Sequence, residues 1–258
     1  MDLGLNNRTA LICASSRGLG KACAAALARE GCRVVINGRS VDALAGTAEE
    51  LTRQGFTVTA VAADINTEAG RQLLLQACPA PDILVNNNAG PPPGDFQQWT
   101  EADWLQAVQS NMLAPIFMIK AVIEGMQARQ FGRIINITSA MVKSPHPMMG
   151  LSTAARSGLT AFAKGLSKTV AKDNVTINNL LPERFDTDRQ KHMAGLMVKQ
   201  RGISLAEARR EIASTIAANR FGEPTEFGDA CAYLCSAQAG YISGQNLQLD
   251  GGSYAGLI

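Results

Sequence analysis

Residues 10–27 read ALICASSRGLGKACAAAL, and this stretch decides the fold. The apolar run 10–13 breaks into small and glycine residues, and an alanine-rich segment of high helix propensity follows. This pattern predicts a buried strand, a tight turn and a helix. Small residues at such a turn let backbone amides approach a ligand, and the helix N-terminus attracts a phosphate. A dinucleotide fits this pattern well, although an ordinary strand-to-helix turn would share it.

Beyond this stretch, the chain alternates between apolar runs and amphipathic segments. With 258 residues, 46% of them hydrophobic, it has enough apolar residues for the core of one domain, spanning 1–258. Further strands are expected at 33–37, 57–62, 82–86, 132–138, 175–180 and 246–249, and further helices at 41–54, 67–77, 101–128, 153–171 and 225–237. Apolar strands separated by helices predict an α/β protein with a single doubly wound parallel sheet, the Rossmann fold. Ligands bind such sheets at the carboxyl ends of the strands.

Charge and composition bear on partners and location. A net charge of +2 gives no basic field of the kind that nucleic acid or an anionic membrane requires. No apolar stretch reaches the roughly 18 residues of a membrane span, and MDLGLNNRTALI does not read as a secretion signal. We therefore expect a cytoplasmic protein. The six cysteines lack zinc-site spacing and are expected to be reduced core thiols, with no metal site; Cys231 and Cys235 lie one helical turn apart but have no further ligands nearby.

Residues after the second and third expected strands bear on the cofactor. Gly38 and Arg39 follow the second strand, where an acidic residue would accept the ribose 2′-hydroxyl of NAD. Arg39 and Arg17 instead suit a 2′-phosphate, so we expect NADP(H) to be preferred over NAD(H); the alternative is that both arginines are simply solvated. Asp64 either accepts from the adenine amino group or caps the helix expected at 67–77.

The residues after the fourth expected strand, LVNNNAG at 84–90, complete a recognisable set. With the first loop, they resemble the short-chain dehydrogenase/reductase family, especially its 3-oxoacyl-carrier-protein reductase-like members. The family loop TGxxxGxG matches 13–20 with Ala14 at the first glycine, and NNAG matches 87–90 or 86–89. Further matches are Asn111, INITS at 135–139, LPERFDT at 181–187 in place of PGxxxT, and the ending RFGEPTEF through GQNLQLDGG. Together they cover essentially the whole chain.

This resemblance implies an oxidoreductase that transfers hydride between NADP(H) and a small carbonyl or imine substrate. It also implies a homotetramer or homodimer. The cofactor-binding residues that we predict are Ala14, Ser15, Ser16, Arg17, Gly18, Leu19, Gly20, Arg39, Asp64, Asn88, Ala89, Gly90, Arg156, Pro182 and Thr187.

The catalytic centre departs from the family pattern. Usual members carry a serine after the fifth strand, a tyrosine about 13 residues later, a lysine four residues further on, and an asparagine in the preceding helix. Ser139 and Asn111 match, whereas Ser152 and Arg156 stand at the tyrosine and lysine positions. The tyrosines of the chain lie far toward the C-terminus, and none fits the missing position by spacing: Tyr233, Tyr241 and Tyr254.

The replacement weakens proton transfer but keeps a positive charge. A phenol has a pKa near 10, whereas the hydroxyl of Ser152 is a far weaker acid. Arg156 stays charged and is expected to anchor a developing alkoxide or the nicotinamide ribose. Ser139 is expected to donate a hydrogen bond to the substrate, and Asn111 to organise water or backbone. His146 is a second candidate proton source, unless it is an exposed bystander, and Lys143 a weaker one.

Three functions remain open from the sequence. The first is a reductase of a substrate that needs little acid help, such as a quinone, an activated diketone or an iminium ion. The second is a catalytically silent nucleotide-binding family member. The third is a non-redox, dehalogenase-like enzyme; halohydrin dehalogenases also use this arginine, but they keep the tyrosine and lose the nucleotide loop, the reverse of this chain.

Residues 187–219 correspond to the variable substrate lid of the family. The segment is rich in methionine, which suits an adaptable apolar surface, and in basic residues that either attract an anionic substrate or form the solvated outer face of amphipathic helices. Glu183 replaces a family glycine just before it, so the backbone path beside the nicotinamide is expected to differ.

Overall fold

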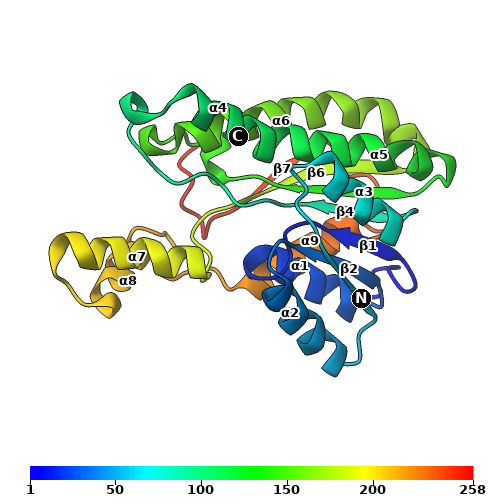
Figure 1. The fold of residues 1–258 in the computed structure, drawn as a ribbon, viewed down its shortest axis with the longest axis horizontal. Coiled ribbons are helices and arrows are strands. Elements are labelled where there is room, and N and C mark those ends of the chain that lie inside the picture. The colour runs from blue at the N-terminus through cyan, green and yellow to red at the C-terminus, as the bar shows by residue number, and fades with distance from the viewer. Residues whose placement is uncertain (258) are drawn as a thin grey trace.

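A seven-stranded parallel sheet organises the computed structural model, which describes residues 1–257. The strand order is β3-β2-β1-β4-β5-β6-β7, so the chain winds outward from β1 in one direction and then, from β4, in the other (Figure 1). This confirms the predicted doubly wound Rossmann fold. The strands are β1 (Thr9–Ile12), β2 (Arg33–Gly38), β3 (Val58–Ala62), β4 (Ile83–Asn86), β5 (Gly132–Ile137), β6 (Val175–Pro182) and β7 (Asn246–Leu249).

Helices cover both faces of this sheet. The α-helices of residues 1–257, including α7 and α8 outside these two layers, are α1 (Gly18–Arg29), α2 (Val41–Arg53), α3 (Glu68–Ala77), α4 (Glu101–Val108), α5 (Ala114–Ala128), α6 (Gly150–Val170), α7 (Asp188–Arg201), α8 (Leu205–Ser214) and α9 (Pro224–Cys235). The core on one face includes residues of α1, α2 and α9, and the core on the other includes residues of α3, α5 and α6. None of these helices combines the length and apolarity that crossing a membrane requires, within residues 1–257.

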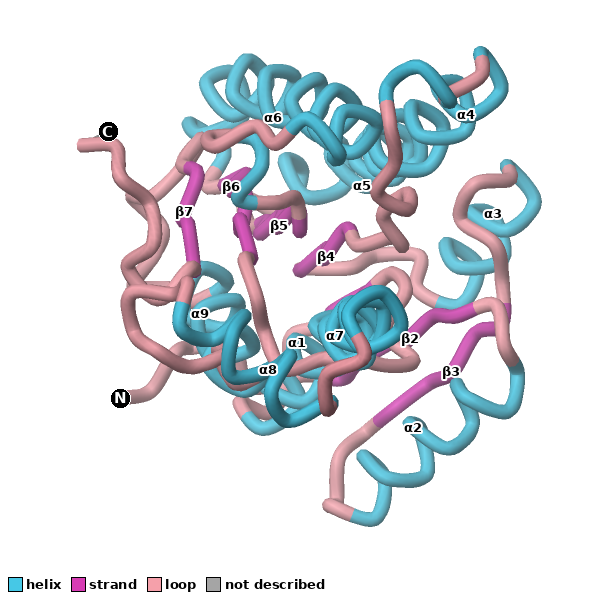
Figure 2. Tube along the Cα trace, turned by 90° about the vertical axis from the view of Figure 1, so that its left-hand side faces the viewer, coloured by secondary structure: helices cyan, strands magenta, loops and turns pink. Residues whose placement is uncertain are grey.

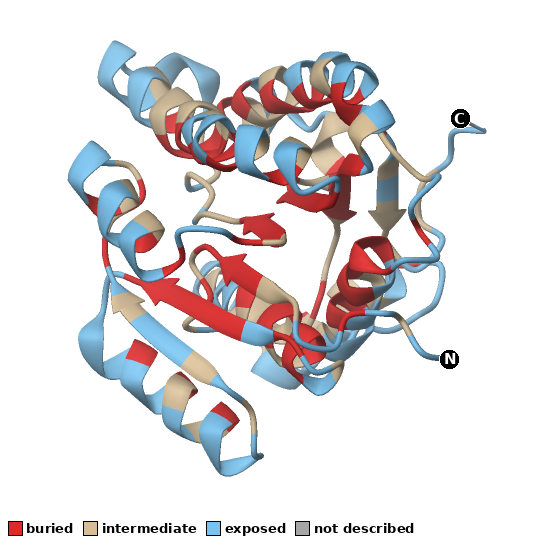
Figure 3. Cartoon of the chain, turned by 90° about the vertical axis from the view of Figure 1, so that its right-hand side faces the viewer, coloured by how far each residue is buried: buried red, intermediate tan, exposed pale blue. Residues whose placement is uncertain are grey.

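Burial explains why the inner strands read as continuous apolar runs. Every residue of β4 and β5 is buried, because helices pack on both sides (Figure 3). The edge strands β3 and β7 are partly exposed. All six cysteines are buried free thiols, as predicted, and the described part of the chain contains no cluster of three His, Cys, Asp or Glu side chains placed to hold a metal.

The helix expected at 101–128 is interrupted, so that prediction was wrong in detail. A π-helical turn, Gln109–Leu113, separates α4 from α5. Pro115 lies at the start of α5, and because proline has no N–H it cannot continue the α-helical hydrogen-bond ladder. Such π turns concentrate at functional sites, and this one contains Asn111.

Four asparagines form a ladder across the second half of the sheet. Nδ2 of Asn86 donates to Oδ1 of Asn136 at 2.9 Å, Asn136 donates to Asn179 at 2.9 Å, and Asn179 donates to Asn246 at 2.7 Å. Each pair is in register on neighbouring strands. The ladder therefore fixes the relative positions of β4 to β7 close to the strand ends at which the loops of the predicted site begin.

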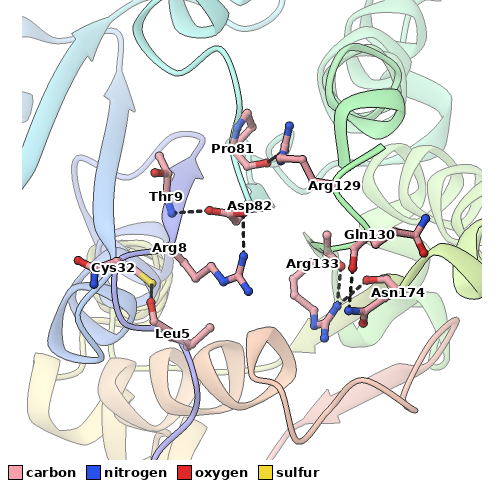
Figure 4. Close-up of polar contacts among 12 residues, drawn as sticks. Leu5, Arg8, Thr9, Cys32, Pro81, Asp82, Arg129, Gln130, Arg133 and Asn174 are labelled. Carbon is pink, nitrogen blue, oxygen red and sulfur yellow. Dashed lines mark hydrogen bonds and ion pairs between the residues drawn. The ribbon is translucent and has the colours of Figure 1, made fainter. Parts of the chain in front are cut away.

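At the opposite ends of the strands, charged side chains hold the chain together, and one of them, Arg133, is buried (Figure 4). Arg133 donates to the carbonyl oxygens of Gly132, Asn174 and Ser236 at 2.9, 2.9 and 3.2 Å. Asp82 accepts from the N–H of Thr9 and from the guanidinium of Arg8 nearby. Asp82 thus joins the beginnings of β1 and β4, and Arg133 joins the beginning of β5 to the residue before β6 and to the end of α9.

The predicted lid region folds into two helices, α7 and α8. In Figure 1 they project from one side of the sheet, and Figure 2 looks onto them. The left-handed Gly202 ends α7, and Arg201 forms an ion pair with Glu211 of α8.

Candidate active site

Hydrogen bonds to Ile12 and Asn37 hold the turn between β1 and α1 in place. Ala14 has a φ of 44°, in the left-handed region, and its N–H donates to Oδ1 of Asn37 at 3.2 Å. Ser15 is buried; its hydroxyl donates to the carbonyl of Ile12 and accepts from the N–H of Asn37 at 2.8 and 2.9 Å. Ser15 thus shapes the turn from inside, whereas Ser16 and Leu19 are only partly buried.

Both glycines of the turn are required by its geometry. Gly18 has a φ of 58°, and a Cβ on Gly20 would lie 2.5 Å from the carbonyl oxygen of Ala14. Helix α1 then starts with no capping bond from the side chain of Arg17 and no acidic residue in its first turn. Its first amides therefore suit an anion, which is the fit expected for a dinucleotide diphosphate.

Two arginines stand beside this turn. Arg17 and Arg39 are exposed, and neither forms an ion pair with another residue of 1–257. A Cβ on Gly38, next to Arg39, would lie 3.0 Å from the side chain of Ser16, so the two loops are in contact. This arrangement suits the 2′-phosphate of NADP.

The loops after β3 and β4 are joined by amide side chains. Nδ2 of Asn88 donates to Oδ1 of Asn66 at 2.9 Å and to the carbonyl of Ser110 at 3.0 Å. Asp64 accepts from the N–H of Asn66, and the cap of α3 is Thr67, so the interpretation of Asp64 as that cap was wrong. Asn66 was not anticipated, because its partner lies in another loop.

The three consecutive asparagines after β4 have separate contacts. Asn86 belongs to the ladder within the sheet, and Asn87 donates to the carbonyl of Ala14 at 3.0 Å, which joins this loop to the β1–α1 turn. Asn88 joins the loop after β3 to the π turn through its bonds to Asn66 and Ser110. In the π turn, Asn111 is buried and donates to the carbonyl of Ala89 at 3.4 Å.

The segment after β6 contacts the turn between β1 and α1. Pro182 is the last residue of β6 and pairs with Leu249 of β7. Five residues later, Cγ2 of Thr187 lies 3.9 Å from the Cβ position of Gly18. The structure thus brings the predicted residues of the two loops together.

Ser139 follows β5 and begins a 3₁₀ turn, Ala140–Val142. Its Oγ accepts from the N–H of Met141 at 3.2 Å, which leaves the hydroxyl proton available to a ligand. This turn packs against α6, the helix that carries both replacement residues.

Ser152 and Arg156 form a direct pair on α6. Nη1 of Arg156 donates to Oγ of the buried Ser152 at 2.6 Å, one helical turn away. Because the guanidinium can only donate, it occupies an acceptor position of the serine and leaves the hydroxyl proton free for a substrate oxygen. Burial, with a smaller contribution from Arg189, lowers the pKa of Arg156 to about 10, so it remains charged at neutral pH.

A family model described as enoyl-(acyl carrier protein) reductase matches residues 13–254. The chain belongs to the short-chain dehydrogenase/reductase family. It is 32% identical over 255 residues to the NADPH-dependent reductase BacG of Bacillus subtilis (strain 168), covering 96% of this chain and 98% of that protein. It is also 32% identical over 254 residues to the 3-oxoacyl-[acyl-carrier-protein] reductase FabG of Vibrio harveyi, covering 98% of this chain and 99% of that protein.

Solved structures agree with this assignment. The L-sorbose reductase of Gluconobacter frateurii, complexed with NADPH and L-sorbose, superimposes with a TM-score of 0.95 at 28% identity and full coverage of both chains. YwfH, an NADPH-dependent reductase involved in bacilysin biosynthesis, superimposes with a TM-score of 0.91 at 31% identity, covering 98% of this chain and 100% of that one.

Two further groups of this short-chain dehydrogenase/reductase lie after β5. His146 is exposed, and its Nδ1 accepts from the N–H of Met148 at 3.3 Å, which makes it the cap of the 3₁₀ turn Pro147–Met149. Nζ of Lys143 lies 5.3 Å from the ring centroid of Tyr254. Sequence spacing missed this contact, because it joins the C-terminal segment to the loop after Ser139.

Proposed function

We propose that this protein is an NADP(H)-dependent oxidoreductase that transfers hydride between the nicotinamide and a small carbonyl or imine substrate. The observation that carries the proposal is the 2.6 Å hydrogen bond between Arg156 and Ser152. This bond supports the proposal, because it combines a positive charge with a free hydroxyl proton at the two positions where the family pattern has its tyrosine and lysine.

The retained nucleotide features support NADP(H). The uncapped start of α1 would hold the diphosphate, and Arg17 and Arg39 would hold the 2′-phosphate in preference to the free hydroxyl of NAD(H). Asp64 would accept from the adenine amino group, and Arg156 and Thr187 would contact the nicotinamide half. When bound, the cofactor supplies or accepts the hydride.

The protein side chains would act on the carbonyl oxygen. Ser139 and Ser152 donate hydrogen bonds to it, and Arg156 stabilises the negative charge that develops there. Asn111 holds the loop of Ala89 in place through its hydrogen bond. Proton delivery by the hydroxyl of Ser152 is weak by comparison with a tyrosine, and the second candidate, His146, is an exposed cap of the turn Pro147–Met149. A weak proton donor favours activated substrates such as quinones, diketones or iminium ions.

We further propose a cytoplasmic enzyme in which α7 and α8 act as the substrate lid, assembled as a homotetramer or homodimer. The family resemblance of the chain supports the assembly. The position of α7 directly after Thr187 supports the lid, because that residue also adjoins the nucleotide turn.

The test is NADPH oxidation by the purified protein against quinones, diketones, acetoacetyl thioesters and cyclic imines, beside Ser139→Ala. NADPH binding is measured in the same samples by its fluorescence. Turnover that falls with Ser139→Ala supports the reductase. Tight NADPH binding without any turnover would instead favour a silent nucleotide-binding protein, and absence of binding would overturn the cofactor assignment.

A further inference from the structure

Two guanidinium groups converge on Gly90, directly after the loop that leaves β4. Nη1 and Nη2 of Arg156 lie 3.0 and 3.2 Å from the position where a Cβ would stand on Gly90, and Nη1 of Arg189 lies 3.3 Å from it. Arg189 also donates to the carbonyl oxygens of Gly90 and Pro91 at 3.3 Å each. One arginine comes from the core helix α6 and the other from the first turn of α7.

No carboxylate of residues 1–257 neutralises this pair. Two other arginines of the lid region are paired, in contrast: Arg201 with Glu211, and Arg209 with Asp186. Two like charges held together, one of them largely buried, are unfavourable without a counter-ion. Each effect also lowers the pKa of Arg156, with burial the larger cause and Arg189 the smaller. An anion between the two groups would relieve both.

The location indicates which anion. The diphosphate of a dinucleotide has its own donors at the start of α1. Arg156, in contrast, is bonded through Nη1 to Ser152, so a group held by Nη2 lies beside the reacting oxygen. The two 3.3 Å bonds of Arg189 are long, and a charged acceptor replaces neutral carbonyl oxygens favourably.

We propose that Arg156 and Arg189 together bind a carboxylate of the substrate, so that the substrate is an oxo acid whose carboxylate lies close to its carbonyl. This inference rests on the proposed hydride-transfer function. Because Arg189 belongs to α7, the bound carboxylate would also hold the lid against the loop at Gly90 and Pro91.

The experiment measures binding to the NADP⁺ complex by calorimetry, with two matched probe pairs. The pairs are pyruvate with methyl pyruvate, and benzoylformate with methyl benzoylformate. Within each pair only the acid carries the carboxylate charge, and the two pairs differ in the size of the group beside the carbonyl. The variant is Arg189→Gln, and the matched control is Arg201→Gln, which alters an arginine of the same helix that is already paired with Glu211. NADPH affinity and NADPH oxidation are recorded for each protein.

We expect the wild type to bind at least one acid about tenfold or more tightly than its ester, because each charge-assisted hydrogen bond adds affinity. Arg189→Gln should lose that preference, and Arg201→Gln should keep it. Equal affinity of the wild type for acid and ester in both pairs would overturn the proposal. So would a weaker NADPH affinity in Arg189→Gln with the acid preference intact, which would assign the arginine to the cofactor diphosphate. If the wild type binds the acid more tightly than the ester but reduces no carbonyl, the result supports the carboxylate site and contradicts only the proposed hydride-transfer reaction.

Discussion

Replacing Arg156 by methionine should stabilise the nucleotide-free protein while removing its function. The guanidinium is largely buried and lies beside Arg189, and its pKa is lowered from its ordinary value to about 10. At about 1.4 kcal/mol per pKa unit, the charged form costs the folded state about 3 kcal/mol at neutral pH. Loss of the bond to Ser152 removes about 1.5 kcal/mol of stabilisation, and methionine keeps most of the packing.

The net expectation for Arg156→Met is a gain of about 1–2 kcal/mol in the free energy of unfolding, or about 2–8 °C in Tm. Urea unfolding at about pH 8, followed by circular dichroism at one protein concentration, measures it. The control is Arg133→Met. Burial also lowers the pKa of Arg133, but its guanidinium serves three carbonyl oxygens. Arg133→Met should therefore lose about 2–4 kcal/mol.

The advantage of Arg156→Met should also depend on pH with a defined sign. The penalty of Arg156 is fully present below pH 10 and disappears as pH rises toward 12.5, because the folded protein releases the proton first. At about pH 11 the difference between wild type and variant should shrink by about 1 kcal/mol. A destabilised Arg156→Met at about pH 8, or a difference that stays constant up to about pH 11, would refute the account of a costly buried charge.

Three further predictions concern the site and its support. Ser152→Ala should lower kcat by about 10- to 100-fold and leave the Kd for NADPH within about twofold, because it removes a hydrogen-bond donor that only the reacting oxygen would use. Stopped-flow fluorescence measures NADPH binding separately from turnover, and an equal loss in kcat and in NADPH affinity would contradict this prediction. Arg39→Ala should weaken NADPH about tenfold with little effect on NADH, measured by fluorescence titration, and equal weakening of both would remove the 2′-phosphate argument. Asn136→Ala leaves Asn86 Nδ2 and Asn179 Oδ1 without their partners and should lower the free energy of unfolding in urea by about 2–4 kcal/mol. A loss below about 1 kcal/mol would show that the asparagine ladder does not stabilise the fold.

The sequence predicted the sheet well because its strands are buried on both faces and read as apolar runs. Residues that follow strands, such as Ser139 and Gly90, were predicted for the site because parallel strands end at one side of the sheet and because these residues match the family pattern; their roles stay predictions. The interruption at Gln109–Leu113 was missed, because Pro115 is compatible with the first turn of a helix and only the structure shows that a helix restarts there.

Long-range contacts were beyond reach for a different reason. The ladder of asparagines depends on strand register, and the approach of Arg189 to Gly90 joins residues about one hundred positions apart. The spacing of residues along a chain carries no information about such long-range contacts. The sequence does not distinguish Arg189 from the other basic residues of 187–219, whereas its contact with the loop at Gly90 distinguishes it from the paired Arg201.

The same contacts connect the weak acid at residue 152 with the proposed substrate. Arg156 polarises Ser152 through a 2.6 Å hydrogen bond, but an aliphatic hydroxyl still does not approach the acidity of a phenol. The proposed hydride transfer would therefore require a carbonyl that is reactive without strong proton donation. An oxo acid held by Arg156 and Arg189 meets this requirement, because neutralising its carboxylate beside the carbonyl makes the carbon more electron-poor. One pair of arginines would then select the substrate and compensate for the missing tyrosine.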